Sequence, residues 1–259
     1  MLIAAWRWKI IVSDDKIPFF LLLRLTMVGL FFNNFLPTGA GGDIVKGYYL
    51  LKGRPQKLDL GISIFMDRLV GTLSIMTLGF TALLFSSNLP EPTVYFIPII
   101  YVVILFFLLL AAWPGLGRVL GRAFFLSAWG KPGESVRRFY YGLHGYLQNP
   151  SSLFRALLVS FAGQLLIVGA NYLVTLSLKT PAPPILLFTS IPLIWAFSAV
   201  PSLGGLGVRE ASYLFFFQDQ MGRENAFALG LLIFGLSLLA SLAGGLTYFL
   251  GGVQWQKKN

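Results

Sequence analysis

Long apolar runs are the feature of this sequence that most restricts its fold. Five are close to or above twenty residues, at Pro18–Leu36, Ser63–Ser87, Thr93–Ala112, Leu153–Leu178 and Ala226–Leu250. About 20 helical residues at 1.5 Å each cross a hydrocarbon core of roughly 30 Å. A sixth run, Pro184–Val200, is shorter and contains Pro192, and Ala211–Phe217 is too short to cross alone. We therefore predict an all-α, polytopic membrane protein with five to seven membrane segments, including broken or re-entrant helices.

The composition favours one membrane domain over a soluble fold. Apolar residues make up 56% of the 259 positions and charged residues 12%, and the mean hydropathy is +0.74. Soluble domains average about 25% charged residues, so this chain has too little polar surface for one. The apolar runs extend from near the first residue almost to the last. We predict that residues 1–259 form a single integral membrane domain, without a separate soluble catalytic domain.

The excess of positive charge indicates which loops face the cytoplasm. The formal charge is +10, from 20 Lys and Arg against 10 Asp and Glu. Cationic loops stay on the cytoplasmic side of membranes, where they also meet anionic headgroups. Trp113–Ser152 carries five Lys or Arg residues against Glu134 alone, so we place it in the cytoplasm and Leu89–Pro92 and Lys179–Pro183 on the far side. No nucleic-acid recognition module is visible, and no nucleic-acid partner is expected.

The N-terminal residues conflict with this simple count of crossings. Trp6-Arg7-Trp8-Lys9 is typical of a basic, aromatic anchor at the cytoplasmic interface. One full crossing by Pro18–Leu36 would place this anchor opposite the basic loop Lys46–Lys57. Either one of these assignments is wrong or Pro18–Leu36 is re-entrant. The chain also opens abruptly on the anchor without a signal-peptide pattern, which suggests that an upstream helix is missing.

Two stretches rich in proline and glycine interrupt the apolar runs in the same way. The first motif is Asn33–Asp43 (NNFLPTGAGGD), and the second motif is Pro201–Glu210 (PSLGGLGVRE). Each ends an apolar segment with proline and a hydroxyl residue and continues through glycines. Opposite charges then precede another apolar, aromatic stretch. The recurrence indicates related halves of one protein.

A helix interrupted inside a membrane exposes backbone N–H and C=O groups that lipid cannot satisfy. Such breaks are tolerated where they are buried in protein or line a polar cavity. A helix that restarts after glycines directs N–H groups and a positive dipole end at any nearby anion, and a phosphate headgroup suits that site. Paired interrupted segments are also typical of a transporter binding site. The alternative is that both motifs are interfacial turns with solvated charges.

The candidate lipid-binding residues come from these motifs and from polar positions near them. The principal candidates are Asp43, Asp67, Arg209 and Glu210; the glycines that would shape the site are Gly41, Gly42, Gly204, Gly205 and Gly207; and the second-rank candidates are Asn33, Asn34, Arg24 and Lys46. Asp67 and Arg68 lie just inside an apolar run, where a charge at the membrane centre costs on the order of 2.5–3.5 kcal/mol. We expect Asp67 to meet Lys46 or Arg209 from another segment, and snorkelling is the alternative.

Two further polar residues share a helix face. Gln164 and Asn171 are seven positions apart, so they project from nearly the same side of a helix. We predict that they hold helices together rather than bind substrate.

Three motifs follow one another along the chain: Phe31–Asp43, Asp67–Gly71 (DRLVG) and Gly204–Glu210 (GGLGVRE). Together and in this order they resemble the lysylphosphatidylglycerol synthase transmembrane-region family. This is the flippase-like module of bacterial multiple peptide resistance factors, which also occurs as stand-alone membrane proteins in bacteria and archaea. The resemblance covers most of the chain and implies a multi-pass protein of the inner (plasma) membrane.

In the two-part resistance factors, this type of module is associated with moving aminoacylated phosphatidylglycerol between leaflets, while a separate soluble domain performs aminoacyl transfer. Nothing in this chain resembles that soluble domain. The resemblance implies a protein that binds an anionic phospholipid or an isoprenoid lipid and moves it between leaflets. Its expected partners are membrane lipids, with a second copy of the chain or a lipid-modifying enzyme as further candidates.

Enzyme signatures are weak in this sequence. It has no phosphate-binding loop, no metal-ligand spacing, no cysteine and a single histidine, His144. We expect no metal and no cofactor, and we favour a protein that is not an enzyme. Two alternatives stay open. One is a membrane-embedded enzyme or accessory subunit that acts on a lipid phosphate through Asp43, Asp67 and Glu210, and the other is a structural membrane scaffold.

Overall fold

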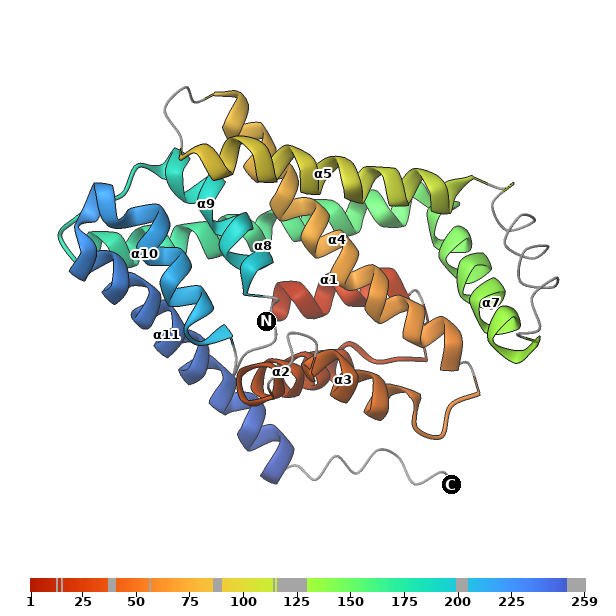
Figure 1. Cartoon of the computed structure of the whole chain (residues 1–259). Coiled ribbons are helices and arrows are strands. Elements are labelled where there is room, and N and C mark those ends of the chain that lie inside the picture. Colours follow the sequence, from red (N-terminus) through yellow and green to blue (C-terminus); the bar gives the residue numbers. More distant parts are fainter. Residues whose placement is uncertain are drawn as a thin grey trace.

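The chain folds into α-helices packed along one another (Figure 1). A computed structural model describes residues 1–12, 14, 16–36, 41–55, 57–85, 90–113, 115, 130–198 and 205–250, and of residues 130–137 it describes the backbone only. Ten helices lie in these ranges: α1 (Leu2–Val12), α2 (Phe19–Phe35), α3 (Gly41–Leu51), α4 (Lys57–Leu84), α5 (Glu91–Ala112), α7 (Gly130–Leu147), α8 (Pro150–Ser177), α9 (Pro184–Phe197), α10 (Val208–Met221) and α11 (Arg223–Leu250). The all-α prediction is confirmed.

Four helices are long and apolar enough to cross a membrane, namely α4, α5, α8 and α11. Three of them, α4, α8 and α11, have 28 residues each, or about 42 Å at 1.5 Å per residue. The predicted runs Pro18–Leu36 and Pro184–Val200 form the shorter apolar helices α2 and α9, of 17 and 14 residues. The chain is thus a multi-span membrane protein with four long apolar helices and two shorter ones.

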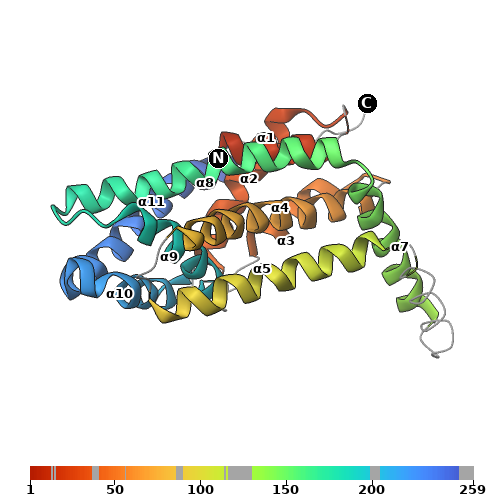
Figure 2. The same ribbon diagram turned by 90° about the horizontal axis from the view of Figure 1, so that it is seen from above.

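The long helices α4, α5 and α8 run side by side, with α4 between the other two (Figure 2). The first helix, α1, lies antiparallel along the first half of α8. A Cβ atom at Gly163 would contact Ile3, Arg7 bonds to Ser160, and Ile11 belongs to the same buried cluster as Ala156. The N-terminal helix is therefore part of the packed bundle.

The short helices pair into two hairpins. In the α2–α3 hairpin, a Cβ atom on Gly42 would collide with the backbone of Gly29 and with Asn33, and one on Gly29 would collide with Lys46. Residues late in α2 thus contact the start of α3, and earlier residues of α2 contact later ones of α3. The two helices are therefore antiparallel. The α9–α10 hairpin turns back in the same way (Figure 1). Each hairpin leads back to the end of the molecule from which it started.

Each hairpin has its own apolar core. Around α2 and α3, the buried side chains include Trp8, Leu22, Leu25 and Leu50. A larger cluster surrounds α9 and α10 and draws on α4, α5, α8 and α11. The last helix, α11, connects the two regions, because its first half packs against α10 and its second half packs against α2.

Candidate functional site

One residue of each interrupted motif contacts the same stretch of α11. Asn34, in the first motif, donates to the carbonyl oxygen of Ser237 at 3.4 Å. Arg209, in the second motif, holds its guanidinium carbon 4.5 Å from the centre of the Phe234 ring. Phe234 and Ser237 are one turn apart and lie near the middle of the 28-residue helix. Two segments far apart in sequence therefore converge halfway along a membrane-length helix.

Asn34 of the first motif and Arg209 of the second motif thus lie against neighbouring positions of α11. The turns themselves, Pro37–Ala40 and Pro201–Gly204, lie outside the described residues. The candidate Gly204 is among these residues.

The second motif restarts its helix through glycines in the left-handed region. Gly205 and Gly207 have φ values of +82° and +86°, which a residue with a Cβ adopts only with strain. The N–H of Gly207 donates to Glu210 Oε2 at 2.6 Å. The acid at the start of α10 therefore fixes the turn that precedes it, as in the backward half of a capping box.

Arg209 is mostly buried beside this acid. Its Nη2 donates to Glu210 Oε1 at 3.5 Å, and its Nε lies 3.5 Å from the same oxygen but without hydrogen-bond geometry. Nε has no hydrogen-bond partner among the described residues. Arg209 thus has a buried donor beside Phe234 of α11 that no described acceptor satisfies.

The first motif places a carboxylate between two cations. Asn33 Oδ1 accepts from the N–H of Gly42 at 2.7 Å and so holds the start of α3 against α2. On the next residue, Asp43 Oδ1 lies 3.3 Å from Lys46 Nζ, while Asp43 Oδ2 accepts from Arg68 Nε. The second-rank candidates Asn33 and Lys46 therefore belong to one arrangement with Asp43.

Asp67 pairs with neither of the residues that the sequence suggested. The expectation of Lys46 or Arg209 is wrong, since Asp67 Oδ1 accepts from Arg7 Nε at 2.7 Å. The reason is the position of α1, which packs against both α4 and α8. Asp67 is 8% exposed, on a helix that begins at Lys57 rather than at Ser63. Ten residues, or about 15 Å of helix, separate Asp67 from the start of α4.

The interfacial anchor at the N-terminus is likewise corrected. Arg7 points into the bundle and Trp8 is 1% exposed, with its indole N–H donating to Ser63 Oγ at 3.2 Å. Trp6, by contrast, is exposed. Arg7 is a buried charge that sequence reasoning missed; an arginine between two tryptophans fits either location, and its acidic partner is 60 positions away.

A buried hydrogen-bond chain continues from Arg7 to α8. Arg7 Nη1 donates to Ser160 Oγ at 2.9 Å, and Ser160 Oγ lies 2.7 Å from Ser74 Oγ. Gln164 Nε2 donates to the carbonyl oxygen of Gly71 at 3.1 Å. On the same helix, Asn171 Oδ1 accepts from the hydroxyl of Tyr213 on α10 at 2.6 Å. The prediction that Gln164 and Asn171 hold helices together is confirmed.

Arg24 lies apart from these contacts. It is exposed on α2 and makes no ion pair with any residue that the structure describes. Its role as a lipid-phosphate ligand stays a prediction. Among the described residues, no group of three or more His, Cys, Asp or Glu side chains could hold a metal ion.

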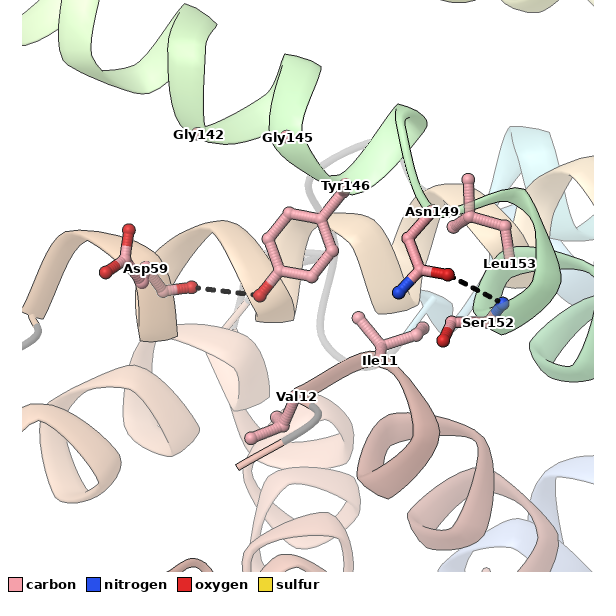
Figure 3. Close-up of a pocket in the computed structure, with 9 residues that line it drawn as sticks. All are labelled: Ile11, Val12, Asp59, Gly142, Gly145, Tyr146, Asn149, Ser152 and Leu153. Carbon is pink, nitrogen blue, oxygen red and sulfur yellow. Dashed lines mark hydrogen bonds between the residues drawn. The ribbon is translucent and has the colours of Figure 1, made fainter. Parts of the chain in front are cut away.

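A shallow pocket of about 310 Å³ lies where the end of α1 and the start of α4 meet the end of α7 and the start of α8 (Figure 3). It is lined by Ile11, Val12, Asp59, Gly142, Gly145, Tyr146, Asn149, Ser152 and Leu153. The Tyr146 hydroxyl donates to the backbone oxygen of Asp59 at 3.4 Å. Burial, with the charge of Asp59, raises the pKa of Tyr146 to about 12, so this hydroxyl stays protonated at neutral pH. None of the candidate lipid-binding residues lines this pocket.

A comparison with protein-family models gives one match. A model described as the lysylphosphatidylglycerol synthase TM region matches residues 1–245. No curated protein and no solved structure matches the chain.

Proposed function

The chain belongs to the lysylphosphatidylglycerol synthase TM region family, and from that premise we propose that it binds an anionic phospholipid or an isoprenoid lipid and moves it between leaflets. We place it in the inner membrane of a bacterium or archaeon. In this proposal, both hairpins are re-entrant. The α2–α3 hairpin enters from the cytoplasm, and the α9–α10 hairpin enters from the far side.

The observation that carries the proposal is the position of the polar groups. Asn34 and Arg209, one from each motif, contact the middle of α11. The acid of the Arg7–Asp67 pair lies ten residues from the start of α4. Charges at the centre of a bilayer are costly and rare, and those that occur commonly mark a substrate or ion pathway. A protein that only anchors itself in the membrane has no use for such groups.

The physical task of a lipid translocator explains the arrangement. A phosphate headgroup crossing a bilayer loses its hydration, and polar protein groups halfway across lower that cost. The guanidinium of Arg209 would offer charge-assisted hydrogen bonds to phosphate oxygens, and its buried Nε is a donor in need of an acceptor. Glu210 holds the turn that positions Arg209.

The test is lipid movement in reconstituted vesicles. Labelled phosphatidylglycerol, aminoacylated phosphatidylglycerol and an isoprenoid phosphate are each followed between leaflets, with and without a membrane potential. We expect the intact protein to accelerate movement of at least one of them. Arg209→Gln should slow that movement by about tenfold or more, because a buried charge contact is worth at least ~1.4 kcal/mol. Arg223→Gln, at the exposed start of α11, is the matched control and should behave as the wild type.

Each alternative function predicts a different result in the same vesicles. An enzyme would generate new lipid products, which mass spectrometry detects, whereas a translocator changes only the leaflet distribution. A scaffold would leave both unchanged. No acceleration by the intact protein for any of the three lipids would reject the proposal.

A further inference from the structure

One carboxylate in the first motif faces two cations from two different helices. Asp43 uses Oδ1 toward Lys46 Nζ on its own helix, at 3.3 Å, and Oδ2 toward Arg68 Nε on α4. Asp43 also lies in the first turn of α3, where the helix dipole favours negative charge. Both oxygens of the acid are thus engaged by positive groups.

The two cations differ in how exposed they are. Lys46 is 13% exposed; its stem packs where a side chain on Gly29 would stand, and its ammonium lies 5.5 Å from the centre of the Trp8 ring. Arg68 is 46% exposed. The cluster is therefore closed on the Lys46 side and open on the Arg68 side, eleven residues into α4.

This geometry matches what a phosphodiester requires. A phosphodiester carries one negative charge and two free oxygens, as a carboxylate does, and guanidinium and ammonium groups are its usual protein ligands. We propose that Asp43 is an internal placeholder: it holds Lys46 and Arg68 in position until a phosphate group enters from the Arg68 side and takes over both cations.

This placeholder role rests on the proposed function. It also predicts whether removing the charge of Asp43 strengthens or weakens lipid binding, which the function alone does not. If Asp43 were simply a ligand for the lipid, removing its charge would weaken binding. As a competitor for the same two cations, its removal strengthens binding. The neutral variant should also release lipid more slowly and thus move it more slowly.

The experiment measures phosphatidylglycerol retained by the purified protein in nanodiscs of phosphatidylglycerol and phosphatidylcholine, counted by native mass spectrometry. Asp43→Asn should retain phosphatidylglycerol about three- to tenfold more strongly than the wild type, whereas Lys46→Gln and Arg68→Gln should retain it correspondingly less. Asp219→Asn, an exposed acid of α10, is the control and should match the wild type. Inorganic phosphate at millimolar concentration tests the source of the ligand. Displacement would assign the site to phosphate in general, and no displacement assigns it to the lipid.

Unchanged or weaker retention by folded Asp43→Asn would overturn the placeholder while leaving lipid movement by the wild type intact. If Asp43→Asn does not fold, the thermal stability of the other variants decides. Phosphatidylglycerol should stabilise the wild type and not Arg68→Gln, and equal stabilisation of both overturns the proposal. Failure of the proposed function is distinguishable, because the wild type would then move none of the lipids.

Discussion

At the scale of single residues, three buried or half-buried acids of this protein are held by partners on other helices or on the backbone. Asp67 accepts from Arg7 on α1, Asp43 from Arg68 on α4, and Glu210 from the N–H of Gly207. An ionised group without such partners is strongly disfavoured in an apolar interior. Each partner is thus as important to the fold as the acid that it serves.

We predict that Arg7→Gln lowers the free energy of unfolding by about 3–5 kcal/mol, because it leaves the Asp67 carboxylate unpaired between helices. The free energy of unfolding is measured by thermal or denaturant unfolding in detergent. The double variant Arg7→Gln with Asp67→Asn should recover part of the loss, since no charge then stays buried. Arg24→Gln, at an exposed position of α2, should change stability by less than about 0.5 kcal/mol. A loss of similar size in Arg24→Gln would contradict this account.

The sequence predicts which residues are charged at membrane depth but not how they pair. Asp67 stands out because it follows apolar residues, whereas Arg7 is also compatible with an interface. Their pairing depends on α1 packing against both α4 and α8, which no local pattern encodes. Asn33 and Lys46 are lipid-binding candidates from the sequence, but their contacts with Gly42 and Asp43 follow from the α2–α3 hairpin and from one helical turn.

At the scale of helices, glycines set how closely the segments approach. A Cβ atom on Gly244 of α11 would collide with the carbonyl oxygen of Met27 on α2, and one on Gly245 would overlap the ring of Phe31. Small residues at such crossings let two backbones touch, which is the main packing device of membrane helices. The α2–α3 hairpin is thereby fixed against the second half of α11.

We expect Gly244→Ala to destabilise the protein by about 1–3 kcal/mol, since the obstacle is a backbone atom that cannot move aside. Gly235→Ala is the control on the same helix. A Cβ atom there meets nothing within 4 Å, and alanine favours a helix over glycine by about 0.8–1 kcal/mol. Unfolding of both variants in detergent should therefore shift in opposite directions. Equal shifts would mean that the α2–α11 crossing is not this close.

Helix existence is predicted well from the sequence, and helix ends are predicted less well. The apolar runs locate every long helix, because hydrophobicity over a bilayer thickness is a strong signal. The start of α4 is missed by six residues, since the polar segment at Lys57 continues the helix outside the apolar part. The short α3 is not predicted as an element, because eleven amphipathic residues after a glycine break resemble a loop.

At the scale of the whole molecule, the hairpins decide which loops share a side of the membrane. If α9 enters and α10 returns, then Pro183 and Glu224 lie on one side, together with Glu91. If α9 and α10 instead crossed as one segment, Glu224 would lie opposite. The same logic applies to the first hairpin, with Lys16 and Lys52 at its two ends.

The absence of native cysteine makes this arrangement directly testable. Single cysteines at Glu91, Pro183 and Glu224 should react with an impermeant reagent added to intact cells. Cysteines at Lys16, Lys52 and Ser151 should be protected until the membrane is opened, because the positive-inside rule places those positions in the cytoplasm. Labelling of Glu224→Cys together with the protected group would reject the re-entrant α9–α10 hairpin.

The contact between Asn34 and Ser237 has a consequence for how the protein is made, since it joins residues 203 positions apart. Chains emerge from the ribosome N-terminus first, so the first hairpin enters the membrane long before α11 exists. During that interval its interrupted backbone lacks the helix that will cover it. Because lipid cannot satisfy that backbone, the insertion machinery must shield the hairpin until synthesis reaches the final span. A ribosome that stops before α11 therefore leaves a membrane-inserted but unfinished protein, of the kind that quality-control proteases remove.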